Sequence, residues 1–265
     1  MSEPQRVAIV TGGGTGIGAA IARRLAGAGT AVALVGRRRG PCEDVAGEIA
    51  ASGGLAHAID ADMGDPSVPQ ALVDEVLATW GRLDVVVNNA AIIKNLPLAE
   101  MSRELFDQHL AVNIRGPFLL VQAALPSLTA SGSGAVVNIS SSSASLAIPG
   151  QAVYGLTKAA LEYLTRSWAA ELAPRQIRVN CIAPGPIDTP IHLSWAADME
   201  TAYRALRDAT PLHRIGEPDD IARWVEHLCD PRETFVTGSV IAIDGGQTLN
   251  GWSSAISDAA ATTAS

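Results

Sequence analysis

The sequence predicts an α/β fold of the doubly wound type, in which helices cover both faces of a parallel β-sheet. Strand-like and helix-like segments alternate along the chain, the strand-like segments are continuously apolar, and the first of them ends in a glycine-rich turn. A strand with one solvated face would alternate apolar and polar residues, whereas a parallel strand buried on both faces reads as an unbroken apolar run. The sheet is therefore expected to be parallel and covered on both sides.

The strand and helix signals follow one another in a regular order. A strand at residues 7–10 precedes the glycine-rich turn, and a helical pattern over residues 17–28 leads through Gly29 into a second strand at 31–35. The stretches between the later strands are long enough for helices, which completes the alternation of a doubly wound sheet. Those later strands are expected at residues 55–59, 83–87, 134–139, 177–182 and 239–243.

The chain of 265 residues is 48% hydrophobic and can bury one large core. Neither an internal repeat nor a Pro/Gly-rich linker divides the sequence, so residues 1–252 are expected to form a single domain. Residues 190–214 lie between a strand and the next helix, and we expect them to form an inserted helical lid. The Ala/Ser/Thr-rich residues 253–265 are expected to be a flexible tail.

Charge and cysteine content exclude several classes of function. A net charge of −8 and a pI near 5.1 argue against nucleic acids or anionic membranes as the main partner. No apolar run approaches the length of a membrane span, and the amino terminus lacks the plan of a signal peptide. Cys42, Cys181 and Cys229 are widely spaced and form no CxxC pair that would bind zinc. We therefore expect a cytoplasmic protein with buried, reduced cysteines and no metal site.

The turn after the first strand reads Thr11-Gly12-Gly13-Gly14-Thr15-Gly16-Ile17-Gly18. Glycines allow a tight turn and a close approach of the backbone to a pyrophosphate, which the amino end of the next helix then stabilises. A glycine-rich turn alone is weak support, because many such turns are only flexible loops. Its place between the first strand and the first helix favours a dinucleotide site.

Three arginines, Arg37, Arg38 and Arg39, follow the second strand. An acidic residue at this point would accept hydrogen bonds from the adenosine ribose and repel a 2′-phosphate, whereas arginine would attract that phosphate. The sequence therefore favours NADP(H) as the cofactor. A solvated arginine run at the entrance to a helix is the alternative.

One tyrosine and one of the two lysines stand in a spacing that suggests proton transfer. Tyr154 and Lys158 are four residues apart on an expected helix, so the phenol and the ammonium share one face. The positive charge is expected to stabilise phenolate and to lower the pKa of Tyr154 toward neutral pH. Ser141 follows the strand at 134–139, at the edge where open parallel sheets bind their ligands.

In combination, these residues resemble the short-chain dehydrogenase/reductase superfamily. The resemblance extends from about residue 6 to residue 250. It implies a seven-stranded parallel sheet, a nicotinamide cofactor and a homotetramer. The matching features, in order, are the glycine-rich octet, Asn88-Asn89-Ala90, Asn113, Ser141, Tyr154 with Lys158, and Pro184-Gly185.

The resemblance assigns catalytic roles to four residues. Ser141 would hold the substrate oxygen, Tyr154 would exchange a proton with that oxygen, and Lys158 would hold the nicotinamide ribose and lower the tyrosine pKa. Asn113 resembles the helix asparagine that binds a water molecule behind the lysine. Because Ser141 belongs to the run Ser140–Ser143, its choice over a neighbour rests on the thirteen-residue gap to Tyr154 that the family shows.

The resemblance also implies the cofactor contacts. Asp62 would meet the adenine amino group, although Asp60 is a near neighbour and either residue could serve only in a turn. Ile187 and Thr189 would bond the nicotinamide carboxamide, with ordinary turn chemistry as the alternative. Asn88 would support the site by bonding across strands. The expected set is Gly12, Thr15, Gly16, Ile17, Gly18, Arg37, Arg38, Asp62, Met63, Asn89, Tyr154, Lys158, Pro184, Gly185, Ile187 and Thr189.

The substrate is expected to be a small molecule in an apolar or aromatic pocket. The lid would contribute His192 and Trp195, and Ile148 and Val153 would line the pocket beside Ser141. Packing of the lid residues on their own helix is the alternative.

These expectations converge on an NADP(H)-dependent oxidoreductase that interconverts a ketone and a secondary alcohol. In the resembled superfamily, enoyl reductases typically space the tyrosine and lysine further apart, so the three-residue gap here favours a carbonyl over a carbon–carbon double bond. The alternatives are a 3-oxoacyl-(acyl carrier protein) reductase, kept open by Arg204, Arg207 and Arg214, and a catalytically silent NADP(H)-sensing protein. Apolar helices near 103–130 and 153–173 favour a partner subunit.

Overall fold

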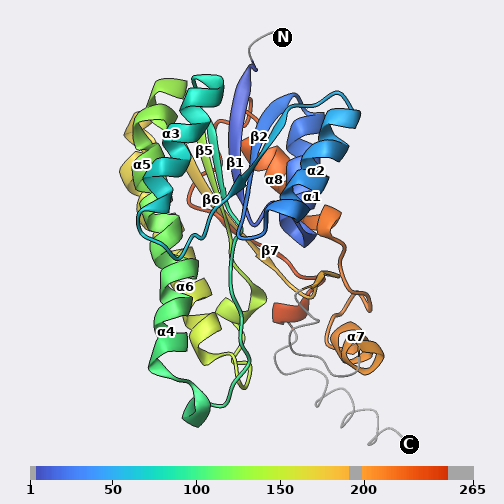
Figure 1. Ribbon diagram of the computed structural model, residues 1–265. Helices are drawn as coiled ribbons and strands as arrows, with labels where there is room; N and C mark the ends of the chain where they lie inside the picture. Colours follow the sequence, from blue (N-terminus) through green and yellow to red (C-terminus); the bar gives the residue numbers. More distant parts are fainter. Residues whose placement is uncertain (1–3, 191–198, 250–265) are drawn as a thin grey trace, which may run out of the picture.

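The computed structural model describes residues 4–190 and 199–249. Seven parallel strands form one sheet in the order β3-β2-β1-β4-β5-β6-β7 (Figure 1). The strands are β1 (Arg6–Thr11), β2 (Thr30–Gly36), β3 (Ala56–Asp60), β4 (Val85–Asn88), β5 (Gly134–Ile139), β6 (Ile177–Pro184) and β7 (Val240–Ile243). The helices are α1 (Gly16–Gly27), α2 (Arg39–Ala51), α3 (Val68–Trp80), α4 (Arg103–Leu110), α5 (Gly116–Ser131), α6 (Ala152–Leu172), α7 (Met199–Asp208) and α8 (Pro218–Cys229).

The strand order reverses beside β1, and this reversal creates the site. The chain runs outward from β1 to β2 and β3 and then crosses back to β4, which pairs with the other side of β1. Ala8 consequently pairs with both Val32 and Val85. The helices that follow β1 and β4 lie on opposite faces of the sheet (Figure 1). The connecting loops diverge as a result, and a crevice is left at the carboxyl ends of the two strands.

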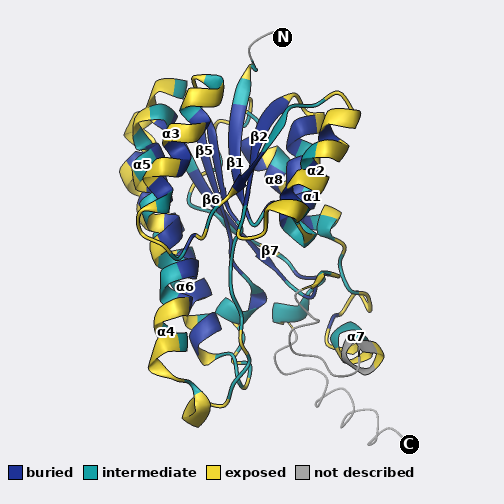
Figure 2. Cartoon of the chain, in the orientation of Figure 1, coloured by how far each residue is buried: buried dark blue, intermediate teal, exposed yellow. Residues whose placement is uncertain are grey.

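Helices cover both faces of the sheet, as predicted. α1, α2 and α8 pack on one face, and α3, α5 and α6 pack on the other (Figure 1). Successive side chains of β1 point to alternate faces, so Ala8 and Val10 enter one core while Val7 and Ile9 enter the other. Figure 2 shows the central strands buried along their length. Burial on both faces explains the unbroken apolar runs in the sequence.

Each predicted strand is present within two residues of its expected bounds. The start of β4 shows the clearest shift, since it begins at Val85 rather than at residue 83. The reason is Asp84, whose buried carboxylate accepts hydrogen bonds from the backbone N–H of Val7 and from the Arg82 guanidinium. Because the Val7 N–H bonds to this carboxylate and not to a backbone carbonyl oxygen, β4 begins after Asp84.

The lid predicted over residues 190–214 contains the helix α7 in the part that the structure describes. Residues 191–198 and the tail predicted at 253–265 lie outside the described residues. The three cysteines are free and buried, as expected. No helix within residues 4–190 and 199–249 is both long and apolar enough to cross a membrane.

Candidate active site

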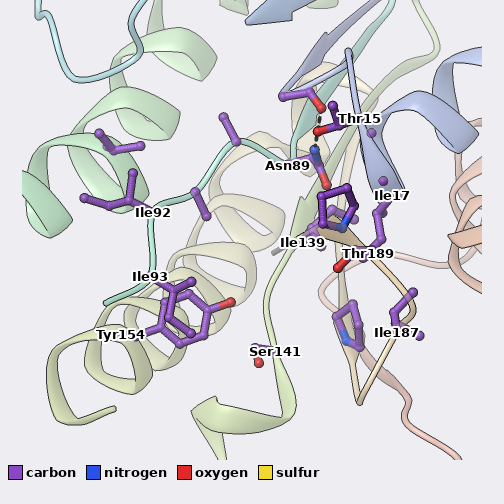
Figure 3. A pocket seen from close by; sticks show the side chains of 18 of the residues that line it. Thr15, Ile17, Asn89, Ile92, Ile93, Ile139, Ser141, Tyr154, Ile187 and Thr189 are labelled. Atoms are coloured by element: carbon purple, nitrogen blue, oxygen red, sulfur yellow. Dashed lines mark hydrogen bonds between the residues drawn. The ribbon is translucent and has the colours of Figure 1, made fainter. Parts of the chain in front are cut away.

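A cavity of about 740 Å³ opens at the carboxyl ends of the strands. One end reaches the glycine-rich turn between β1 and α1, and the other reaches Ser141 and Tyr154. Figure 3 shows Ile187 and Thr189 across the cavity from Tyr154. Its volume is that of a small-molecule site. The cavity therefore joins the predicted nucleotide-binding turn to the predicted catalytic residues.

The glycine-rich turn has a conformation that requires glycine. Gly12 and Gly16 have φ values of 66° and 51°, in the left-handed region. A Cβ atom at Gly18 would overlap the carbonyl oxygen of Gly12, so the first turn of α1 packs directly on the loop. Thr15 and Ile17 also line the cavity, as predicted. The unpaired backbone N–H groups at the amino end of α1 are thus available to an anion.

The side chain of Asn89 holds this turn in place. Its Nδ2 donates to the backbone carbonyl oxygens of Thr11 and Gly12, at 2.8 and 3.2 Å. The Thr11 hydroxyl accepts hydrogen bonds from the backbone N–H groups of Asn89 and Ala90, both at 3.0 Å. Asn89 lines the cavity, but its amide donors bind the protein. It therefore supports a cofactor by fixing the turn.

Asn88 bonds across the sheet, as predicted. Its Nδ2 donates to Oδ1 of Asn138 at 2.8 Å, and Nδ2 of Asn138 donates to the Thr165 hydroxyl at 2.8 Å. All three side chains are buried. Since Asn88, Asn138 and Thr165 lie on β4, β5 and α6, these bonds hold the helix that carries Tyr154 and Lys158 against the sheet.

The three arginines after β2 differ in their surroundings. The Arg39 guanidinium donates to Glu43 at 2.7 Å, one helical turn further along α2. Arg37 and Arg38 are exposed, line the cavity and make no ion pair within the described residues. Two of the three guanidinium groups are therefore available to a ligand.

The other predicted cofactor contacts come from separate segments that converge on the cavity. Asp62 lines it, whereas Asp60, the last residue of β3, is not among the described residues that do. The Oδ1 atom of Asp62 accepts the backbone N–H of Gly64 at 2.9 Å, which orients the carboxylate. The remaining lining residues predicted from the sequence are Met63, Pro184, Gly185, Ile187 and Thr189.

Ser141, Tyr154 and Lys158 meet at the other end of the cavity. Tyr154 and Lys158 lie one turn apart on α6, and Nζ of Lys158 is 5.6 Å from the centroid of the tyrosine ring. This Nζ donates a hydrogen bond of 2.7 Å to the carbonyl oxygen of Ile139, at the end of β5. Ser141 lies two residues beyond the end of β5, and its hydroxyl is close enough to the phenol to affect the pKa of Tyr154. The end of one strand and the start of one helix thus assemble the cluster.

Burial controls the acidity of this tyrosine and lysine. It raises the pKa of Tyr154 to about 12, and the hydrogen bond with Ser141 offsets only part of the rise. Burial also lowers the pKa of Lys158 to about 8. Lys158 is not among the causes of the Tyr154 shift, so its lowering of the tyrosine pKa stays a prediction.

Asn113 lies in a π-helical turn, Ala111–Arg115, that joins α4 to α5. Its Oδ1 accepts the backbone N–H of Ile92 at 2.9 Å, while Nδ2 donates to the Ile92 carbonyl and to the Thr157 hydroxyl, both at 3.0 Å. The side chain therefore ties the loop after β4 to α6. The water-binding role of Asn113 stays a prediction, and the π-helical turn that holds it is a distortion frequent at functional sites.

The structure separates the serines that composition alone could not distinguish. The Ser140 hydroxyl donates to the carboxylate of Glu162 on α6 at 2.9 Å, and Ser142 is buried. Of the four serines, Ser141 is the one that affects the pKa of the Tyr154 phenol.

Gln151 lines the same end of the cavity, and the sequence interpretation missed it. The Ser141 hydroxyl donates to that of Ser143 at 3.1 Å, which in turn donates to Oε1 of Gln151 at 2.7 Å. A signal for this residue was present, because Gln151 precedes Tyr154 by three positions at the start of the same helix.

The predicted substrate contacts are placed in part. Ile148 lines the cavity, with Ile92 and Ile93 from the loop after β4. Val153 is buried and is not one of the described lining residues, which corrects its prediction. The reason is helical geometry, since adjacent residues point about 100° apart and Tyr154 faces the cavity. His192 and Trp195 lie outside the described residues.

Comparison with known proteins identifies the family. The family model described as enoyl-(acyl carrier protein) reductase matches residues 12–248. An uncharacterized oxidoreductase of Mycobacterium tuberculosis is 41% identical over 246 residues, which cover 92% of each chain. The chain belongs to the short-chain dehydrogenase/reductase superfamily.

Two further relatives of this short-chain dehydrogenase/reductase have described activities. Cis-4-hydroxycyclohexanecarboxylate dehydrogenase of Sinomonas cyclohexanicum is 36% identical over 245 residues, covering 92% of this chain and 97% of that protein. A 3-ketoacyl-(acyl-carrier-protein) reductase of Brucella melitensis, solved in complex with NADH, is 33% identical with a TM-score of 0.84, covering 92% of this chain and 98% of the other. The protein is therefore an oxidoreductase of alcohol or carbonyl groups that uses a nicotinamide cofactor.

Proposed function

We propose that this protein is an NADP(H)-dependent oxidoreductase that interconverts a ketone and a secondary alcohol, with Tyr154 as the acid or base. One observation carries the proposal: the Ser141, Tyr154 and Lys158 cluster and the glycine-rich turn open into the same cavity. A substrate oxygen at the Ser141 and Tyr154 hydroxyls and a dinucleotide at the glycine-rich turn would lie in the same cavity. Hydride transfer requires the two molecules to lie side by side.

The side chains would divide the work of proton transfer. Ser141 would turn its hydroxyl proton from Ser143 to the substrate oxygen, and Tyr154 would donate its proton to that oxygen in reduction and accept it back in oxidation. Because burial raises the pKa of Tyr154, the phenol is protonated and ready to donate at neutral pH. Lys158 is charged below about pH 8 and would bind ribose hydroxyls. A bound nicotinamide supplies or accepts the hydride.

The nucleotide end of the cavity fits a dinucleotide. Gly12, Gly14 and Gly16 line it without side chains, at the amino end of α1 where a pyrophosphate is stabilised. Arg37 and Arg38 line the same end without an ion pair in the part of the chain that the structure describes. Their availability to a 2′-phosphate supports NADP(H) over NAD(H).

A 3-oxoacyl-(acyl carrier protein) reductase is the second candidate, favoured by the Brucella relative. Binding of an acidic carrier protein would need free basic side chains around the lid. Arg207 and Arg214 already pair with Glu200 and Asp220, at 3.1 and 2.8 Å, whereas Arg204 has no ion pair among the described residues. One such arginine supports carrier docking weakly, so a small-molecule ketone is preferred.

An alicyclic alcohol or ketone is the substrate class to test first. The Sinomonas relative is named for a hydroxycyclohexane substrate, and Ile92, Ile93 and Ile148 offer a ring an apolar surface beside Tyr154. A homotetramer in the cytoplasm, without nucleic acid or membrane as a partner, completes the proposal. A catalytically silent NADP(H)-sensing protein is less favoured, because Tyr154 and Lys158 are both present.

The decisive experiment is NADPH oxidation across cyclic ketones, aryl ketones, diketones, sugars and 3-oxoacyl thioesters, with NADH measured in parallel. Turnover of a ketone with NADPH is expected, and Tyr154→Phe should reduce kcat at least about 100-fold because the proton donor is lost. Binding of NADPH by the variant serves as the control for folding. Unchanged turnover in Tyr154→Phe would contradict the proposed role, and NADPH binding without any turnover would favour the sensing protein.

A further inference from the structure

We propose that the side-chain amide of Gln151 is a second hydrogen-bonding contact for the substrate. The site would then select uncharged ketones that carry an ether or carbonyl oxygen near the reacting carbonyl. This inference rests on the proposed ketone chemistry and adds to it the residue that discriminates among ketones.

The backbone holds Gln151 rigidly at the start of α6. Its N–H donates to the carbonyl oxygen of Ile148 at 3.1 Å, and its carbonyl oxygen accepts the N–H of Gly155 at 2.8 Å. Its position three residues before Tyr154 places both side chains on one side of the first helical turn. A contact at Gln151 therefore lies at a constant separation from the phenol that would donate the proton.

The hydroxyl chain determines which half of the Gln151 amide faces the cavity. A serine hydroxyl has one proton, and that of Ser143 is donated to Oε1 of Gln151 at 2.7 Å. Ser143 can then only accept from Ser141, as the 3.1 Å bond between their hydroxyls requires. Nε2 of Gln151 has no hydrogen-bond partner among the described residues, and Gln151 lines the cavity. Its two N–H groups are thus available to a ligand.

The surroundings of Gln151 make such a donor selective. Ile92, Ile93 and Ile148 are the apolar neighbours at this end of the cavity. An apolar substituent placed against the amide would leave its N–H groups without a partner, whereas an oxygen would satisfy them. The charged lining residues in the described part of the chain are Arg37, Arg38 and Asp62 at the nucleotide end, and Lys158 behind the tyrosine. An uncharged oxygen is therefore the favoured partner.

The test uses ketones that differ in one atom. The 2-, 3- and 4-methoxycyclohexanones are each compared with the ethylcyclohexanone of the same substitution, in which a methylene replaces the oxygen. We expect kcat/KM of the wild-type enzyme to be about 10- to 100-fold higher for the methoxy member of at least one pair. In Gln151→Leu this ratio should fall to about one, because both members of a pair then meet the same apolar side chain.

Two further variants sharpen the result. Gln151→Glu retains the acceptor oxygen for Ser143 but loses the amide donor, so it should also lose the methoxy preference. Gln70→Leu is the matched control, because Gln70 is exposed on α3 and its side chain donates to Asp74. A wild-type ratio near one for all three pairs, or an equal loss on both members of a pair in Gln151→Leu, would overturn the proposal.

Calorimetric binding of the same ketone pairs to the NADP⁺-loaded protein separates this inference from the proposed function. A methoxy preference in binding that Gln151→Leu abolishes would support the contact even if no ketone were turned over, and that lack of turnover would count against the oxidoreductase activity alone. Equal affinities within every pair would overturn the contact whatever the turnover.

Discussion

Two buried ionisable side chains, Tyr154 and Lys158, carry the proposed chemistry at the residue scale. Lys158 has a backbone carbonyl as its hydrogen-bond acceptor and no ion pair within the described residues. A lysine in this setting loses hydration when the protein folds, and its pKa falls to about 8 from the 10.5 of a free side chain. The charge that the site needs is therefore maintained at a cost to stability.

This cost has a measurable pH dependence. Between about pH 8 and 10.5 the unfolded chain keeps a proton on Lys158 that the folded chain has lost, so this group makes the folded state more stable as the pH rises. Relative to Lys158→Met, the free energy of unfolding of the wild type should rise across this window, by at most about 3 kcal/mol. Urea unfolding at several pH values measures the difference. Lys94→Met, at the exposed second lysine, is the control, and parallel curves for wild type and Lys158→Met would refute the expectation.

The arginines after β2 offer a second test with an internal control. Arg37 and Arg38 line the cavity, whereas Arg39 is engaged by Glu43. Replacing Arg37 and Arg38 together by alanine should weaken NADPH binding at least about 10-fold and change NADH binding less than about threefold, because only NADPH carries the 2′-phosphate. Arg39→Ala should change neither. Cofactor fluorescence measures the dissociation constants. An equal loss of affinity for NADPH and NADH would contradict the preference for NADP(H).

At the scale of elements, the site depends on how tightly α1 packs against the turn that precedes it. Gly18→Ala would force a Cβ atom into the carbonyl oxygen of Gly12, so the turn and the helix must separate. We expect a loss of about 1–3 kcal/mol in stability and a large loss of cofactor affinity. Gly47→Ala is the matched control, because a Cβ atom in the middle of α2 meets nothing within 4 Å and should stabilise the protein by about 0.5–1 kcal/mol. Thermal unfolding with and without NADPH would show both effects, and similar behaviour of the two variants would contradict this account.

At the scale of the whole molecule, α5 and α6 present a surface that a partner subunit would cover. Phe118, Leu156 and Tyr163 are 43%, 51% and 67% exposed, and the ring of Phe118 packs on that of Trp168, 5.8 Å away between centroids. Exposed aromatic and aliphatic side chains on adjacent helices are typical of an interface between subunits. The homotetramer that the resemblance implies stays a prediction, and this surface is where we expect its subunits to meet.

Light scattering tests this assembly directly. The wild type should have a mass that is a multiple of 27.4 kDa, and fourfold for the tetramer. Tyr163→Glu, which places a charge on the α6 face, should lower that mass, whereas Ala51→Glu, exposed at the end of α2 on the opposite face of the sheet, should leave it unchanged. A monomeric wild type at micromolar concentration would rule the assembly out.

Some features of the fold and of the site can be predicted from short stretches of sequence. The strands can be predicted in this way, because each strand of a parallel sheet is buried on both faces and therefore consists of a continuous run of apolar residues. The pairing of Tyr154 with Lys158 can also be predicted, because a separation of four residues brings two side chains onto one helical face. Asn88 was likewise predicted to bond across strands, and it does so with Asn138.

Other features required the folded chain. The contacts of the other serines in the run are such a feature, since Ser140 bonds to Glu162 on α6. The pKa values of Tyr154 and Lys158 depend on how completely water is excluded, which no local pattern records.

The sequence by itself therefore determined the fold class, the order of the strands along the chain and the residue types that meet at the carboxyl edge of the sheet. The fold class and the strands follow from periodicity and spacing, which are local properties of a polypeptide, and the site residues follow in large part from the resemblance to the family. Only the tertiary structure decided that Arg37 and Arg38 face the cavity together, that Gln151 shares the catalytic end and that burial sets the acidity of Lys158. Those properties arise from contacts between distant segments and from the loss of hydration, and both exist only once the chain has folded.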